Sequence, residues 1–244
     1  MKFKIITLVA CAFLGANANA QLLKDAMNKG KEAISAPKGT PGLTNDEVVS
    51  GLKEALVIGA RKSAEAASLA DGFNKNPLIF IPFPAEAQKM KDRLVSIGME
   101  QKVKDFETSL NRAAEEASKE AYSIFADAVK GMSVGDGFAI LNGGDTAATH
   151  YLREKTYSPL NEKFTPIVRA AIEKVQVTAY WTPLVTAYNK IPGVAKQNPD
   201  LEAYVTAKAI NGLMYLISEQ EAKIRKDPAA QATELLRKVF GKAK

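Results

Sequence analysis

The fold is decided by residues 104–153, KDFETSLNRAAEEASKEAYSIFADAVKGMSVGDGFAILNGGDTAATHYLR. Apolar residues recur at helical spacing from Val103 to Ala128, which predicts one long helix with a continuous apolar face. Small alanines at its middle would let a neighbouring helix approach closely, so we expect this helix at the centre of the molecule. A short helix, a glycine turn and a third helix follow. Two polar groups accompany these helices: Asn111, Arg112 and Glu115, then Asp145, Thr149 and Arg153.

The flanking sequence is also helical by pattern. Thr44 and Glu47 form a capping box that predicts a helix to about Ala70. Pro84 predicts the start of the next helix and Gly98 its left-handed end. Ser133 with Asp136 predicts the cap of the short helix, and Asp145 the cap of the third. A capping residue followed by proline, which predicts a helix start or a kink, then recurs at Ser158-Pro159, Thr165-Pro166, Thr182-Pro183, Asn198-Pro199 and Asp227-Pro228.

Because every strong segment is helical and the links are short, we expect an all-α fold: a single-domain, irregular multi-helix bundle. The exception is residues 71–84, DGFNKNPLIFIPFP, where three prolines and two asparagines exclude a helix. An exposed loop would not carry five large apolar side chains, so we expect an extended strap packed across the bundle, or one short edge strand. The alternative is a docking surface or the rim of an apolar pocket, with Phe80, Ile81 and Phe83 as an apolar wall.

The N-terminus resembles a secretory signal peptide. Lys2 and Lys4 precede an apolar run, residues 5–16, that is too short to span a bilayer. Ala18-Asn19-Ala20 is a cleavage site, so we expect residues 1–20 to be removed and the protein to be exported to the periplasm of a Gram-negative-type bacterium. An N-terminal core helix is the alternative.

A second cleavage pattern, Leu8-Val9-Ala10-Cys11, would instead leave a lipid anchor on Cys11 in the envelope. The preferred cleavage after Ala20 removes this cysteine, the only one in the chain. Residues 21–42 then form a short amphipathic helix and a flexible linker, and residues 43–244 form the helical domain. We find no later stretch apolar enough for a transmembrane span.

Charge and motifs exclude several classes of protein. Removal of Lys2 and Lys4 takes the formal net charge from +6 to +4, with the signs mixed along every helix, which argues against nucleic-acid binding. His150 is the single histidine, so Cys/His nucleophilic catalysis and His/Cys zinc sites are not expected. A Walker loop, a dinucleotide fingerprint and a nucleophile elbow are absent from the sequence. We expect neither a cofactor nor a metal.

The two polar groups allow two interpretations. They can be separate solvated faces, or the faces can meet and form one buried network of Arg112, Glu115, Asp145 and Arg153. Such a network could orient a carboxylate or phosphate ligand, because arginine binds these groups in a bidentate fork. It could equally be structural. The ligand-binding candidates are Asn111, Arg112, Glu115, Asp145, Thr149, Tyr151 and Arg153.

These stretches resemble a bacterial exported family known as domain of unknown function 4197. The resemblance covers about residues 43–241, and it implies an exported, all-helical protein without supplying an activity. Leu110 departs from the expected methionine, and Gly135 and Gly137 loosen a helix that other members build from better formers. The matching motifs are Asn76-Pro77, Ile81-Pro82-x-Pro84, Asn111-Arg112-Ala113-Ala114-Glu115, Gly144-Asp145-x-Ala147-Ala148-Thr149-x-Tyr151-x-Arg153, Asp227-Pro228 and Leu235-Leu236.

Three functions are compatible with this sequence. The first is a non-enzymatic binding or accessory protein for an anionic or amphiphilic small molecule or envelope component, held near Arg112 and Arg153. The second is a structural or protein-interaction module of the envelope, in which the polar motifs only lock the fold. The third is a hydrolase or lyase that uses Glu115 and Asp145 as an acid–base pair.

Overall fold

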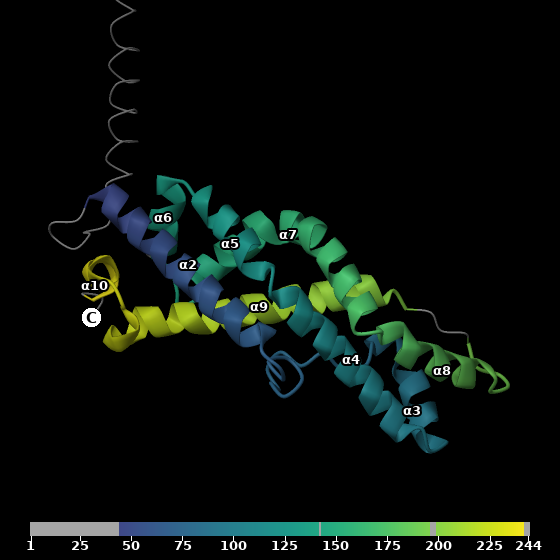
Figure 1. Ribbon diagram of the computed structural model, residues 1–244. Coiled ribbons are helices and arrows are strands. Elements are labelled where there is room, and N and C mark those ends of the chain that lie inside the picture. Colours follow the sequence, from purple (N-terminus) through teal and green to yellow (C-terminus); the bar gives the residue numbers. More distant parts are fainter. Residues whose placement is uncertain (1–43, 142, 196–198, 242–244) are drawn as a thin grey trace, which may run out of the picture. The chain divides into compact units, whose positions relative to one another are not determined.

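The computed structural model describes residues 44–141, 143–195 and 199–241 (Figure 1). The predicted signal peptide, the short helix and the linker, residues 1–42, lie outside the described residues. Within the described ranges every regular element is helical and no strand occurs, which confirms the all-α fold class. The elements are α2 (Asn45–Ser68), η1 (Ala85–Ala87), α3 (Gln88–Ser96), α4 (Glu100–Ser118), α5 (Ala121–Lys130), α6 (Val134–Leu141), α7 (Ala147–Lys174), α8 (Val177–Asn189), α9 (Leu201–Lys226), η2 (Pro228–Ala230) and α10 (Glu234–Phe240).

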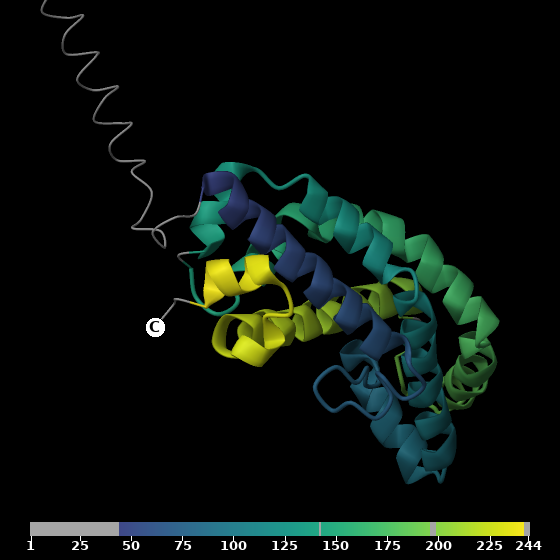
Figure 2. The ribbon, with the colours of Figure 1, turned by 60° about the vertical axis from the view of Figure 1, so that its left-hand side comes forward.

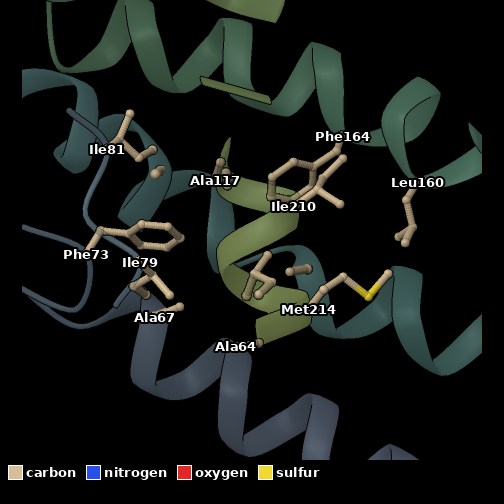
Figure 3. Close-up of a cluster of buried hydrophobic side chains, with 14 of the residues drawn as sticks. Ala64, Ala67, Phe73, Ile79, Ile81, Ala117, Leu160, Phe164, Ile210 and Met214 are labelled. Atoms are coloured by element: carbon tan, nitrogen blue, oxygen red, sulfur yellow. The ribbon is translucent and has the colours of Figure 1, made fainter. Parts of the chain in front are cut away.

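The core lies where α2, α4, α7 and α9 pack together. Helix α9 packs along both α7 and α2, and α4 packs against α7 and α8 (Figure 1). Figure 3 shows side chains of the four helices and the strap pointing toward one another. Full burial of a large apolar side chain contributes about 1.5–3 kcal/mol, so this cluster is the main source of stability. It includes Ala64, Ala67, Phe73, Ile79, Ala117, Phe164, Ile210 and Met214.

The long helix predicted from Val103 to Ala128 is two helices. Helix α4 ends at Ser118 and α5 begins at Ala121, with backbone bonds from Lys119 to Glu116 and from Glu120 to Ala117 that tighten the turn between them. The buried Ser118 hydroxyl donates to the Ala114 carbonyl at 2.7 Å, a side-chain bond that competes with the helical ladder and bends helices. The break lets α5 pack on α2 and α7 instead of continuing the line of α4.

Two of the steps that predicted a helix start or a kink lie inside one helix. Helix α7 continues through Pro159 and Pro166, although a proline inside a helix costs about 3 kcal/mol. Leu160, Phe164 and Val168 follow one another at intervals of four residues and are all buried, so the helix stays on the core through both prolines. Pro183 likewise lies inside α8. These prolines are tolerated because the buried apolar face outweighs the missing hydrogen bonds.

Several predicted caps are confirmed. Glu47 donates its N–H to the Thr44 hydroxyl at 3.2 Å, and Thr44 donates its N–H to the Glu47 carboxylate at 2.7 Å. Ser133 and Asp136 make the same reciprocal pair at the start of α6. Gly98 has a φ of +83°, the left-handed conformation expected at the end of a helix. Helix α10 ends the described chain beside α2 (Figure 2).

The strap, residues 71–84, packs on the bundle as predicted, but it is an irregular series of turns and not the expected extended segment or edge strand. Its apolar side chains point to different sides: Phe73, Ile79, Ile81 and Phe83 are buried, while Leu78 is 63% exposed. Gly212 of α9 allows the close approach, because a Cβ there would lie 2.8 Å from the Phe73 ring. Residues 71–84 therefore form part of the core as well as part of the surface.

Candidate functional site

The first polar group holds the strap through its backbone. Glu107, Asn111 and Glu115 lie four residues apart on α4 and therefore face the same side of the helix. Asn111 is fully buried; its Oδ1 accepts from the Ile81 N–H at 2.8 Å, and its Nδ2 donates to the Ile81 carbonyl at 2.9 Å. Glu107 accepts from the Phe83 N–H at 2.9 Å. Sequence reasoning missed Glu107, whose signal is its spacing from Asn111.

Glu115 completes this row. One of its oxygens accepts from the N–H groups of Phe73 and Asn74, both at 3.1 Å. The other accepts from Nη1 of Arg112 at 2.6 Å. The carboxylate is buried, so all three donors are needed to balance the removal of its charge from water. Glu115 is thus occupied in holding the fold.

Arg112 links this row to the first turn of the strap. Its Nη2 lies 2.7 Å from the Asp71 carboxylate, and its side chain remains 36% exposed. Asp71 has a φ of 69°, in the left-handed region that aspartate tolerates better than most residues. Hydrogen bonds from Lys75, Asn74 and Arg112 hold the pKa of Asp71 well below its usual range. Arg112 therefore fixes a strained turn.

Thr149 of the second polar group lies at the start of α7, which is held by a carboxylate from α9. Glu221 of α9 accepts from the N–H of Ala148 at 2.9 Å, and from both the N–H and the hydroxyl of Thr149 at 2.8 Å. A carboxylate is favourable there, because the first N–H groups of a helix are unpaired and carry partial positive charge. Arg225 lies 2.9 Å from Glu221 and also donates to the Ile140 carbonyl. Sequence reasoning missed both residues, which are distant in the chain.

The predicted Asp145 cap is wrong. Thr146 is the N-cap residue of α7 and makes no side-chain cap bond, because the buried Glu221 takes the free amides instead. Asp145 is about half exposed and pairs with Lys226. Tyr151 donates its hydroxyl to Asp136 at 2.8 Å and ties α7 to α6. Burial, with this hydrogen bond, raises the pKa of Tyr151 to about 12.

The structure does not form the buried network of Arg112, Glu115, Asp145 and Arg153, which was one of the two interpretations of the sequence. Helices α4 and α7 do pack together, but each polar group binds a different neighbour: the strap for α4, and α9 for the start of α7. Glu115 and Asp145 likewise share no contact. One is buried under three donors and the other is paired with Lys226 at the surface, so they are not arranged as an acid–base pair.

An open groove of about 480 Å³ lies between α7, α9 and the strap, and we name it the α7–α9 groove. Of the predicted apolar wall, Phe80 lines the groove, next to Leu78 of the strap. The other two predicted wall residues, Ile81 and Phe83, are buried elsewhere in the core. Of the second polar group, Thr149 and Arg153 line the groove. The remaining lining residues that matter here are His150, Lys208, Asn211 and Tyr215.

The α7–α9 groove is basic. Arg153 and Lys208 line it, and its described lining includes no aspartate or glutamate. Nη1 of Arg153 donates to Oδ1 of Asn211 at 2.7 Å. His150, also at the groove, is 75% exposed and lies 3.7 Å from Glu154. The groove thus combines two permanent cations with exposed apolar side chains.

A second groove, of about 380 Å³, contains Arg112 and Glu115 but has mixed charge. Asp105 and Glu116 line it beside Lys119. Arg112 there is already committed to two carboxylates. Of the two arginines near which a ligand was predicted, Arg112 therefore pairs with two carboxylates, whereas Arg153 pairs with none among the described residues.

A family model described as "Protein of unknown function (DUF4197)" matches residues 42–241. The match spans both polar groups, the strap and the α7–α9 groove. Neither a curated protein nor a solved structure matches the chain. Among the described residues, no helix is both long and apolar enough to cross a membrane.

Proposed function

Since the chain belongs to the DUF4197 family, whose description names no activity, we propose a function from geometry: a non-enzymatic binding protein that holds an anionic amphiphile in the α7–α9 groove. The observation that carries this proposal is the pairing of Arg153 and Lys208 with the exposed strap residue Leu78 in one groove free of described acidic side chains. Ligand sites typically combine apolar walls with a few convergent polar groups.

The polar groups elsewhere support binding over catalysis. Glu107, Asn111, Glu115 and Glu221 each accept a hydrogen bond from at least one backbone N–H group, which favours structural roles for them. A general acid or base must instead reach the substrate proton. We further propose, from the signal-peptide pattern, that binding takes place after export to the periplasm.

The test is isothermal titration calorimetry with three octyl compounds that share one tail. We expect sodium octanoate to bind, octanol to bind more weakly, and octyltrimethylammonium not to bind, because the groove repels a cation. Lys208→Gln should weaken octanoate binding by up to about 1 kcal/mol, the range for exposed charge pairs. Arg153→Gln should weaken it by about 1.5–3 kcal/mol, because it removes both the charge and a charged hydrogen-bond donor. Lys62→Gln, an exposed lysine of α2 outside the groove, is the matched control. Equal binding of all three compounds, or none by octanoate, contradicts the proposal.

A second function has its own support. The row Glu107, Asn111 and Glu115 holds the strap by backbone bonds alone, which is what a module with purely structural motifs would require. This structural or protein-interaction role predicts that no octyl compound binds. It also predicts that Arg153→Gln affects no ligand binding and lowers stability only through the lost Arg153–Asn211 hydrogen bond.

A further inference from the structure

One arginine–carboxylate pair already links helices α7 and α9. Arg169 of α7 donates through Nε and Nη2 to the two oxygens of Glu202 of α9, both at 2.7 Å. This is the bidentate form in which the planar guanidinium fork matches a carboxylate. The Nε–Nη2 edge of the guanidinium makes both bonds, and Nη1 takes no part in them.

Arg153 has the complementary arrangement on the same two helices. Its Nη1 is bound to Oδ1 of Asn211 at 2.7 Å. Its Nε and Nη2, the edge that Arg169 uses, make no hydrogen bond or ion pair within the described ranges of the chain. Arg153 and Asn211 both line the α7–α9 groove. The side of the guanidinium that suits a carboxylate is therefore the side left for a ligand.

We propose that Arg153 binds the head group of the amphiphile side-on through Nε and Nη2, and that Asn211 is the positioning residue that sets the guanidinium for it. The head group is an oxyanion with two equivalent oxygens, a carboxylate or a phosphate monoester. This inference rests on the proposed function of the α7–α9 groove. Asn211 accepts a hydrogen bond without adding charge, so it fixes the orientation of the arginine and leaves its positive charge for the ligand.

Lys208 supplies a second, less directional attraction. It precedes Asn211 by three residues, so both side chains project from the same face of α9. A lysine ammonium acts as a point charge, whereas the arginine fork requires a planar arrangement of acceptors. The two contributions can therefore be separated by substitution.

The experiment measures octanoate and octyl phosphate binding to the full chain by calorimetry, with Arg153→Lys, Asn211→Asp and Lys208→Gln. Arg153→Lys keeps the charge and removes the fork, and we expect about a tenfold loss of octanoate affinity. Asn211→Asp preserves shape but adds a carboxylate beside Nη1, and we expect a similar loss because the ligand charge is repelled. Lys208→Gln should lower the octanoate affinity only about threefold. Octanoate affinity that exceeds octyl phosphate affinity assigns a carboxylate, and the reverse assigns a phosphate.

A spectroscopic readout distinguishes positioning from folding. In the ¹H–¹⁵N spectrum, the Arg153 Nε–H signal should shift downfield with octanoate and stay unchanged with octanol. In Asn211→Asp the shift should be lost while the melting temperature is retained. If Arg153→Lys binds octanoate as tightly as the unchanged protein, side-on binding by the Arg153 guanidinium is wrong, and the proposed binding function stands. If the unchanged protein binds neither octanoate nor octyl phosphate, the binding function itself is wrong.

Discussion

The side-chain amide of Asn111 pairs with the backbone of Ile81 in the way that two β-strands pair. Its Oδ1 accepts from the Ile81 N–H, and its Nδ2 donates to the Ile81 carbonyl. Both groups are buried, and a buried backbone group without a partner costs about 1–3 kcal/mol. Asn111→Ala should therefore lower the free energy of unfolding by about 2–5 kcal/mol, measured by urea denaturation. Asn161→Ala, an exposed position of α7, should change it by less than about 0.5 kcal/mol. A similar effect of both variants would contradict this role.

Glu115 should matter more to stability than Arg112. Glu115→Gln removes the buried charge that binds Arg112. It also places an amide NH2 group, which can only donate, against groups that are themselves donors. We therefore expect the free energy of unfolding to fall by about 2–4 kcal/mol. Arg112→Gln should lose about half as much, because the guanidinium is 36% exposed and water can reach Asp71. Chemical denaturation of both variants tests the order, with Glu100→Gln as the exposed control on α4. The opposite order would mean that the ion pair, rather than the backbone bonds, holds the strap.

Glu221 should control the start of α7. Glu221→Ala leaves the N–H groups of Ala148 and Thr149 without an acceptor and removes the carboxylate beside Arg225. We expect faster amide hydrogen exchange at residues 148 and 149, and a stability loss of about 2–4 kcal/mol. Glu219→Ala, an exposed change on the same helix, should alter neither. Unchanged exchange in Glu221→Ala would show that another group caps this helix.

Tyr151 should add a pH dependence at the alkaline end. Its pKa is raised to about 12, above the ordinary value of 10.0, so the fold favours the protonated phenol. That stability is complete below about pH 10 and is lost as the pH rises toward the folded pKa. Tyr151→Phe should cost about 1 kcal/mol at neutral pH and should flatten the decline above about pH 10 in urea titrations. The pKa of Tyr204 is also raised to about 12, so we expect Tyr151→Phe to retain part of the decline in stability with rising pH.

The proposed export predicts a specific mature terminus. Intact mass of the full chain expressed in a Gram-negative host should match a protein that begins at Gln21. Cys11→Ser should leave this mass unchanged, because Cys11 lies in the removed segment. A diacylated protein that begins at Cys11 would instead establish the lipid anchor.

The sequence predicted the helices best where the signal was local. The capping box at Thr44, the left-handed Gly98 and the Ser133–Asp136 pair involve residues at most three apart, and all are present. The break after Ser118 was missed, because no glycine or proline marks it. The continuation of α7 through Pro159 and Pro166 was also uncertain from sequence, because it depends on side chains buried against other helices.

The sequence by itself determined that the protein is helical, that residues 71–84 are not, and that Asn111, Glu115, Thr149 and Arg153 lie at fixed places on their helices. The tertiary structure alone decided their partners. Asn111 binds Ile81, 30 residues away, and Thr149 binds Glu221, 72 residues away. The strap groups bound by Glu107, Asn111 and Glu115 are backbone groups. Because the backbone is chemically the same at nearly every residue, the sequence carries no signal for such a partner. Only the packing of α4, α7 and α9 brings these groups together.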